Sequence, residues 1–166
     1  NTNTSTTFRA ATAGITLISS DSVVDNATVT FGSLSSASYH GQQDAQDSAG
    51  SAGIFIAGGG PTIRNSSVTA GSGSTSARDS AGSVGIAVMS GSNVTITSNS
   101  LISGGPGDTT GPFYAAGSAG IYLATGNTTV SNNTTIQSDS GSGGSGGRSV
   151  GSVGIYLNAT GTGVSL

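Results

Sequence analysis

Residues 116–136 read AGSAGIYLATGNTTVSNNTTI, and altered copies of this stretch recur along most of the 166-residue chain. Its most constant part is a glycine followed by isoleucine, a variable residue and a second apolar residue, as in Gly120 to Leu123. The other copies begin at Gly14, Gly53, Gly85 and Gly154, so successive glycines lie 39, 32, 35 and 34 residues apart. A repeat of this length predicts a solenoid or another array of stacked units.

Apolar residues alternate within each copy, which is the pattern of a β-strand. Ile121 and Leu123 are expected on one face, and Tyr122 and Ala124 on the other. No segment keeps the apolar spacing of a helix, so the sequence predicts an all-β protein. A second short strand is predicted about ten residues after each glycine, where an apolar residue recurs. These residues are Val24, Ile63, Ile96, Val130 and Val164.

An asparagine follows the second predicted strand in four of the repeats. Asparagine tolerates a left-handed backbone, and stacked amides can hydrogen-bond from one repeat to the next. We therefore predict a ladder of turn asparagines formed by Asn26, Asn65, Asn99 and Asn132, with Asn133 an alternative to the last. A further apolar residue then closes each pattern, at Val29, Val68, Leu101 and Ile136.

The stretches between repeats vary in length and are rich in glycine and serine. With 29 glycines and only 33% apolar residues, the chain can build only a thin core. The variable stretches lack periodicity and are predicted to be surface loops inserted at one corner of each repeat. They run from Phe31 to Ala52, Ala70 to Val84, Ser103 to Ala119 and Gln137 to Val153.

Short strands that stack on their equivalents in the next repeat resemble the right-handed parallel β-helix of the pectin-lyase-like family. The Gly120 to Leu123 core, paired with Thr129 to Ile136, carries this resemblance over roughly Thr12 to Leu166. Bacterial and archaeal surface versions with a Gly/Ser-rich insertion in each coil are the most similar. The resemblance implies a solenoid of about four to five coils in a single domain, residues 1–166. A polar lead-in covers residues 1–12, and coils start near residues 14, 53, 85, 120 and 154.

Stacking about 4.8 Å apart would align equivalent apolar residues into two inward ladders. The first contains Ile15, Ile54, Ile86, Ile121 and Ile155, and the second Leu17, Ile56, Val88, Leu123 and Leu157. Each such burial stabilises the fold by about 1.5 to 3 kcal/mol before chain entropy is subtracted. Phe55, Tyr122 and Tyr156 share an outward column. This strip could stack on sugars, but we favour packing beneath the Gly/Ser-rich loops.

Pectate lyases and polygalacturonases belong to the resembled family, which implies clustered aspartates, a calcium site or a catalytic Arg or His. The seven aspartates here do not recur at equivalent positions of adjacent repeats. A two-carboxylate mechanism needs both groups within about 5 to 10 Å on rigid elements. The single histidine, His40, lies in a polar segment predicted to be a solvated loop, and Arg64 is expected to be a surface arginine rather than a base. We expect no catalytic residue, metal site or cofactor.

Threonine pairs such as Thr28 with Thr30 and Thr95 with Thr97 resemble the Thr-x-Thr rows of ice-binding β-solenoids. Such a surface would need the pairs to recur through the repeats. Because they do not persist in the sequence, we do not predict that function.

Eight asparagines begin Asn-x-Ser/Thr sequons and are candidates for N-glycosylation, although a chain rich in these residues also produces sequons by chance. They are Asn3, Asn26, Asn65, Asn93, Asn127, Asn132, Asn133 and Asn158. The sequons favour an extracellular or cell-surface location. A net charge of -3 with four scattered arginines argues against a nucleic-acid partner. No apolar run approaches the roughly 20 residues of a membrane helix, so we expect no membrane span.

The last repeat, Gly154 to Leu166, stops before its asparagine and its closing apolar residue. Followed by Asn1 to Ser5 of another copy, it would resemble Thr129 to Thr135. An uncapped end exposes strand edges and apolar side chains. We therefore expect head-to-tail contacts through Val164 and Leu166, either between copies in a homo-polymer or between neighbouring modules of a longer chain. The sequence thus favours a structural building block of a surface fibre, filament, sheath or adhesin. The alternatives are a polysaccharide lyase-like or hydrolase-like enzyme and a non-catalytic glycan-binding module.

Overall fold

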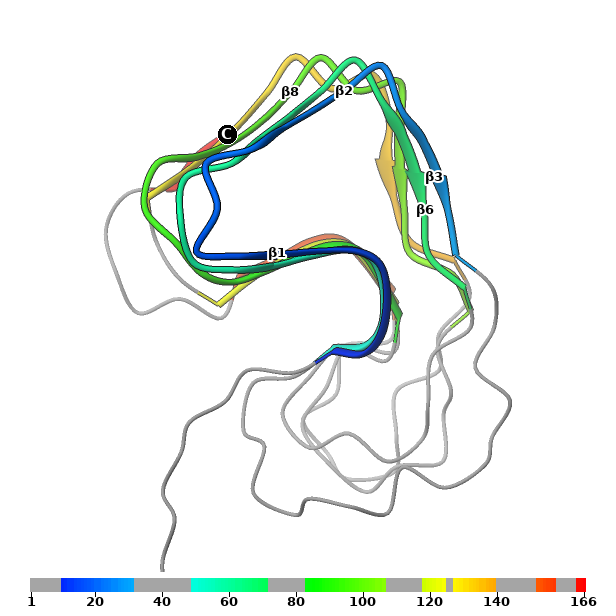
Figure 1. Cartoon of the computed structure of the whole chain (residues 1–166). Helices are drawn as coiled ribbons and strands as arrows, with labels where there is room; N and C mark the ends of the chain where they lie inside the picture. The colour runs from blue at the N-terminus through cyan, green and yellow to red at the C-terminus, as the bar shows by residue number, and fades with distance from the viewer. Residues whose placement is uncertain are drawn as a thin grey trace, which may run out of the picture.

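The computed structural model describes residues 10–31, 49–71, 83–106, 118–124, 127–139, 152–157 and 164–166. Within these segments all the regular secondary structure is β-strand, so the predicted all-β class is confirmed for this part of the chain. In Figure 1 the strands β1, β2 and β3 form three sides of one cross-section, and the equivalent strands of later repeats overlie them. The described residues are therefore stacked repeat upon repeat.

Strands from successive repeats form three parallel sheets. Sheet A contains β1 (Ala10–Ile18), β4 (Ala49–Ala57), β7 (Ser83–Ser90), β10 (Ser118–Leu123) and β13 (Ser152–Leu157). Sheet B contains β2 (Val23–Asp25), β5 (Thr62–Arg64), β8 (Val94–Thr97), β11 (Thr128–Ser131) and β14 (Val164–Ser165). Sheet C contains β3 (Thr28–Thr30), β6 (Ser67–Thr69), β9 (Leu101–Ser103) and β12 (Ile136–Gln137). Neighbours in each sheet come from consecutive repeats, which is a solenoid-like arrangement.

The register of sheet A aligns the residues of the two predicted ladders. Ile15 pairs with Ile54, and the pairing continues through Ile86 and Ile121 to Ile155. The second column runs in the same way from Leu17 through Ile56, Val88 and Leu123 to Leu157. A one-residue slip would turn every one of these side chains to the other face, so the alternation of apolar residues fixes the register.

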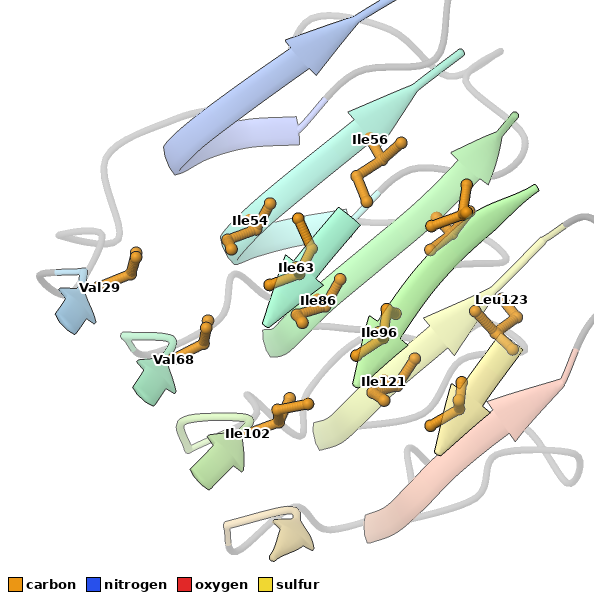
Figure 2. Packing of buried hydrophobic residues seen from close by; sticks show 13 residues of the cluster. Val29, Ile54, Ile56, Ile63, Val68, Ile86, Ile96, Ile102, Ile121 and Leu123 are labelled. Atoms are coloured by element: carbon orange, nitrogen blue, oxygen red, sulfur yellow. The ribbon is translucent and has the colours of Figure 1, made fainter. Parts of the chain in front are cut away.

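The core lies between the three sheets and is built from columns of aliphatic side chains. Ile54, Ile86 and Ile121 have no exposed surface, and Figure 2 shows them on neighbouring strands opposite Val68 and Ile102. Because each side chain contacts its equivalents in the repeats on either side, stability depends on neighbouring repeats more than on any single one.

The recurring glycine allows sheets A and C to approach each other closely. A Cβ atom added to Gly53 would lie 2.5 Å from Cγ1 of Val68, and one added to Gly120 would lie 2.7 Å from Cγ2 of Ile136. Real Cβ atoms do not approach other heavy atoms so closely. Gly53 and Gly120 are therefore required by packing against sheet C and against the next glycine of sheet A, whose carbonyl oxygen would lie 2.7 Å from each added Cβ.

The closing apolar column of sheet C differs from the prediction in one repeat. Val29 and Val68 pair in register, but the next members are Ile102 and Ile136 rather than Leu101. Leu101 pairs instead with Ser67, and strand alternation turns it to the other face. Both residues are apolar, so the sequence alone could not separate them.

Candidate functional site

The turn between sheets B and C carries a column of left-handed residues. Asn26, Asn65 and Asn132 have φ angles of 51°, 50° and 55°, and Ser98 takes the equivalent position with 56°. Side chains with a Cβ rarely adopt this region, and asparagine tolerates it best among them. The predicted asparagine ladder therefore splits into two columns. Asn99 lies one residue beyond the left-handed column, and it forms the expected amide bond between repeats with Asn133, the predicted alternative to Asn132.

Asn99 belongs instead to an inner hydrogen-bonded ladder formed by the residue after each left-handed position. Its side chain is fully buried. The Nδ2 atom of Asn99 donates to the Oδ1 atom of Asn133 at 2.8 Å and to the carbonyl of Ile63 at 3.1 Å. The Oδ1 atom of Asn99 accepts from the backbone N–H of Ser66 at 3.0 Å. The Oγ atom of Ser66 in turn accepts from the N–H of Ala27 at 3.1 Å.

This inner ladder satisfies backbone groups that the turn would otherwise leave unpaired. The Oδ1 atom of Asn133 accepts from the N–H of Asn99 at 3.0 Å, and its Nδ2 atom donates to the carbonyl of Ile96 at 3.0 Å. A buried backbone group without a hydrogen-bond partner destabilises the fold, so each side chain of the inner ladder stabilises the turn of the preceding repeat. The amides of Asn99 and Asn133 are thus occupied within the fold, which gives them a structural role.

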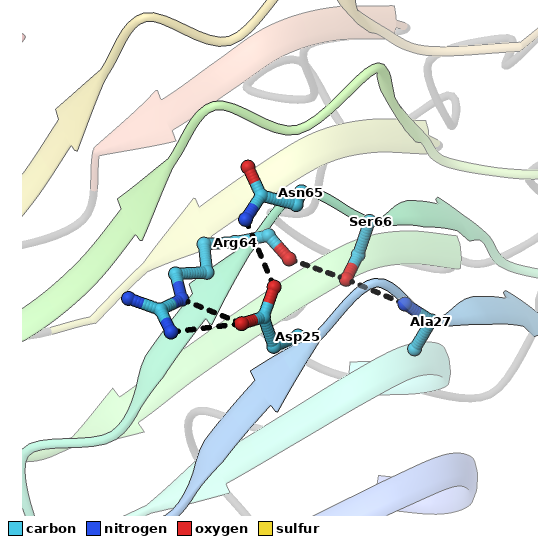
Figure 3. A network of polar contacts seen from close by, with 5 residues as sticks. All are labelled: Asp25, Ala27, Arg64, Asn65 and Ser66. Carbon is cyan, nitrogen blue, oxygen red and sulfur yellow. Dashed lines mark hydrogen bonds and ion pairs between the residues drawn. The ribbon is translucent and has the colours of Figure 1, made fainter.

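A polar network on the outer face of the first two repeats surrounds Asp25. Figure 3 shows Arg64 and Asn65 converging on its carboxylate. The guanidinium of Arg64 reaches Oδ2 through Nε at 2.9 Å and through Nη2 at 2.8 Å. The Nδ2 atom of Asn65 donates to Oδ1 at 2.9 Å. These two side chains, Asn65 foremost, hold the pKa of Asp25 below its ordinary value.

The network does not resemble a catalytic centre. The guanidinium of Arg64 is paired with the carboxylate of Asp25, which gives it a structural partner. Asp21 accepts from the N–H of Gly60 at 2.7 Å and so closes a turn of the next repeat. In the described part of the chain, no three His, Cys, Asp or Glu side chains gather as a metal site would require. His40 and the aspartates Asp44, Asp47, Asp79 and Asp108 lie outside the described residues.

Two members of the outward aromatic column of sheet A, Phe55 and Tyr122, are buried, whereas Tyr156 is partly exposed. Phe55 and Tyr122 are only 2% and 0% exposed, and they belong to a second apolar cluster on the face opposite the ladders. The rings of Tyr122 and Tyr156 stack with centroids 5.5 Å apart and planes 19° apart. A strip that stacks on glycans needs exposed ring faces, so that interpretation of Phe55 and Tyr122 is wrong.

Hydroxyl side chains form a row across sheet B that the sequence analysis missed. Thr62, Thr95, Thr129 and Ser165 pair in register on consecutive strands. Beside this row, the hydroxyls of Thr97 and Ser131 lie 3.1 Å apart. The Thr-x-Thr pairs do not form one row, because Thr28 and Thr30 lie in β3 of sheet C whereas Thr95 and Thr97 lie in β8 of sheet B. Aligning the repeats by the register of β5, β8 and β11 would have found the row.

The described sequon asparagines fall into two groups. Asn26, Asn65, Asn93, Asn127 and Asn132 are exposed, and each has a positive φ angle. Asn133 is half-buried and bound within the inner ladder. Asn3 and Asn158 lie outside the described residues.

Apolar side chains become exposed at both ends of the described stack. Leu157 and Leu166 are 49% and 72% exposed in the last repeat, whereas Ile18 and Val23 are exposed in the first. Val164 is half-buried and packs against the core, where it pairs with Thr128. Continuing that register by one residue aligns Leu166 with Val130.

No protein-family model, curated protein or solved structure matches this chain. None of the described segments forms a helix of the length and hydrophobicity that crossing a membrane requires.

Proposed function

We propose that this protein is a structural, extracellular β-helix module that stacks end to end in a surface fibre, filament, sheath or adhesin, without catalysis. The observation that carries the proposal is the contrast between buried and exposed members of the same core columns. Leu123 is fully buried, whereas its in-register neighbour Leu157 is 49% exposed. A further repeat laid on this end would bury it in the same way.

The strand edges support the same contact. Among the described strands, β1, β2 and β3 each have a neighbour on one side only, and so do β13, β14 and β12 at the opposite end. Free edges carry unpaired N–H and C=O groups that accept a further strand. Because all the pairings are parallel, the two ends differ, and a second copy would join head to tail. Such a heterologous contact propagates into an open filament.

The register of the repeats makes the two ends complementary. A second copy adding its β1 to β13 would set Ile15 against Ile155 and Leu17 against Leu157, extending both columns of sheet A. Leu166 would meet Val24, since both belong to the column that contains Ile63, Ile96 and Val130. Aliphatic contacts of this kind would stabilise the junction as they stabilise the interior.

We further propose that the solenoid is right-handed, with about four to five coils and the Gly/Ser-rich loops at one corner. Connections between parallel strands of one sheet are right-handed in about 98% of proteins, which supports this handedness. The Asn-x-Ser/Thr sequons support a surface location. The occupied amides and the Arg64 pair described above favour a structural role over the enzymatic alternative.

The proposal is tested by analytical ultracentrifugation and negative-stain electron microscopy of the purified chain. The wild-type protein is expected to form concentration-dependent oligomers or filaments. Leu157→Asp puts a carboxylate into the proposed junction and should reduce the product to monomers. Thr129→Asp adds the same charge on the exposed outer face of β11 and should leave assembly intact. Dispersed wild-type monomers at high concentration would contradict the proposal.

A further inference from the structure

Two adjacent asparagines, Asn132 and Asn133, begin overlapping sequons but have different surroundings. Asn132 is exposed at a left-handed turn position with φ 55°. Asn133 is half-buried, and its amide takes part in hydrogen bonds to Asn99 and to the carbonyl of Ile96. The sequence motif is the same for both, so only the structure separates them as acceptors for a sugar.

The exposed sequon asparagines share one local geometry. Asn26 and Asn65 have φ angles of 51° and 50° before sheet C, and Asn93 and Asn127 have 62° and 61° before sheet B. All four side chains are exposed. In each case one residue separates the asparagine from the Ser or Thr that completes the sequon. Each of these left-handed turn asparagines is therefore followed, two residues later, by the hydroxyl residue of a sequon.

We propose that the exposed left-handed asparagines, Asn132 above all, are N-glycan attachment sites, and that Asn133 is not. In the reaction, Nδ2 of the acceptor forms a bond to the anomeric carbon of a lipid-pyrophosphate-linked oligosaccharide. The bond from that carbon to the pyrophosphate oxygen breaks, and the lipid pyrophosphate leaves with its electron pair. Nδ2 loses one proton, so each acceptor carries one sugar chain on a neutral amide.

Sugars at these positions would have space, and they would leave the core contacts unchanged. Asn132 is exposed at its turn, whereas a sugar on Nδ2 of Asn133 would stand against the carbonyl of Ile96, 3.0 Å away. Asn65 retains one N–H after modification and can still donate to Asp25. Glycans on the two turns would flank sheet B and supply hydration to a surface that has few charged side chains. This inference is independent of end-to-end stacking.

The test compares two threonine variants that remove one sequon each and leave both asparagines in place. Thr134→Ala removes the sequon of Asn132, and Thr135→Ala removes that of Asn133. The hydrogen bonds recorded for both residues use backbone atoms, from the Thr134 N–H to Asn99 at 2.9 Å and from Ile102 to the Thr135 carbonyl at 2.9 Å. Neither alanine therefore removes them, whereas Gln at position 132 would strain the left-handed turn.

Each protein is secreted from a eukaryotic cell line that N-glycosylates, and its intact mass is measured before and after enzymatic removal of N-glycans. Thr134→Ala should lose the mass of one glycan relative to wild type, and Thr135→Ala should lose none. Peptide mapping should find the chemical change that enzymatic removal of an N-glycan leaves on its asparagine at Asn132 and not at Asn133. Circular dichroism checks that both variants keep the fold. A glycan on Asn133, an unchanged mass for Thr134→Ala, or a wild-type chain without sugar on the exposed asparagines would overturn the proposal.

Discussion

Leu123 and Leu157 are the same residue type in the same column of sheet A, one repeat apart. Leu123 lies between Val88 and Leu157 and has no exposed surface, whereas Leu157 has a described neighbour on one side and is 49% exposed. The comparison shows that the position along the stack decides what a repeat residue does. In the middle of the stack a ladder residue is core, and at an end the same residue is available surface.

The largest difference is expected from truncating these two leucines. Leu123→Ala removes a fully buried side chain and should lower the free energy of unfolding by about 2 to 5 kcal/mol, because transfer and cavity terms add. Leu157→Ala removes a half-exposed side chain and should cost about 1 kcal/mol in the monomer. Urea unfolding at a dilution that keeps the protein monomeric measures both. Equal losses would contradict the assignment of Leu157 to an open end.

The inner ladder predicts a smaller contrast of the same kind. Asn99→Ala strips partners from the N–H of Ser66, the carbonyl of Ile63 and the side chain of Asn133, and should cost about 2 to 3 kcal/mol. Ser66→Ala, one repeat nearer the first end, removes two bonds, one from the Ala27 N–H and one to the Arg64 carbonyl, and should cost about 1 to 2 kcal/mol. The same urea titrations compare them. If the inner ladder had no structural importance, both substitutions would leave the free energy of unfolding nearly unchanged.

One inner position is expected to gain stability on substitution. Thr128 is fully buried on the core side of β11, and its hydroxyl has no partner among the described residues. Its in-register neighbours in sheet B are Val94 and Val164. Thr128→Val replaces an unpaired hydroxyl by a methyl group of similar size and should stabilise by about 1 kcal/mol. The thermal midpoint should rise, and a lower midpoint would mean that the hydroxyl is bonded.

The smallest effect is expected from the ion pair on the first two repeats. The hydrogen bond from Asn65, followed by that from Arg64, lowers the pKa of Asp25 below 3.8. A lowered folded-state pKa means that this stabilisation is complete well above 3.8 and is lost as the pH falls through the folded-state value. Asp25→Asn should therefore reduce the difference in thermal midpoint between neutral pH and about pH 2. Because the pair is exposed, salt should weaken it.

The Thr97 and Ser131 pair, which stands at the equivalent positions of later repeats, provides the control. Neither hydroxyl titrates in this range, so Thr97→Val should leave the pH dependence unchanged. An Asp25→Asn variant with the same acid sensitivity as wild type would assign that sensitivity to other carboxyls.

The repeat and its register were predictable from the sequence because period-2 alternation and a packing-required glycine mark the same position in every repeat. The ladders from Ile15 to Ile155 and from Leu17 to Leu157 follow directly from that spacing. The split of the asparagines into two columns was overlooked, although Asn26 and Asn65 lie two residues after Val24 and Ile63 whereas Asn99 lies three residues after Ile96. From the left-handed residue to the closing residue, the turn spans Asn26 to Val29 in the first repeat but Ser98 to Ile102 in the third. Both columns contain asparagine, so the residue type alone does not show to which column a given asparagine belongs.

Burial of Phe55 and Tyr122 on the outer face of sheet A agrees with the favoured interpretation of the strip, but strand alternation alone did not establish it. Alternation correctly separates Phe55 and Tyr122 from the ladder residues, but it cannot say whether a face is covered. Coverage depends on contacts between segments that are distant in the chain, and these have no local pattern. The hydroxyl row of Thr62, Thr95 and Thr129 was missed for a related reason, because its members come from three different strands.

The most direct test of the stacking account mixes two variants that block opposite ends. Leu17→Asp places a carboxylate at the first end, and Leu157→Asp places one at the last. Each variant alone should sediment as a monomer, since one of the two complementary ends is lost. An equimolar mixture should form a dimer and nothing larger, because only the intact last end of one variant can meet the intact first end of the other. Circular dichroism must show that both remain folded. A mixture that stays monomeric while the wild-type protein assembles would contradict head-to-tail stacking through these ends.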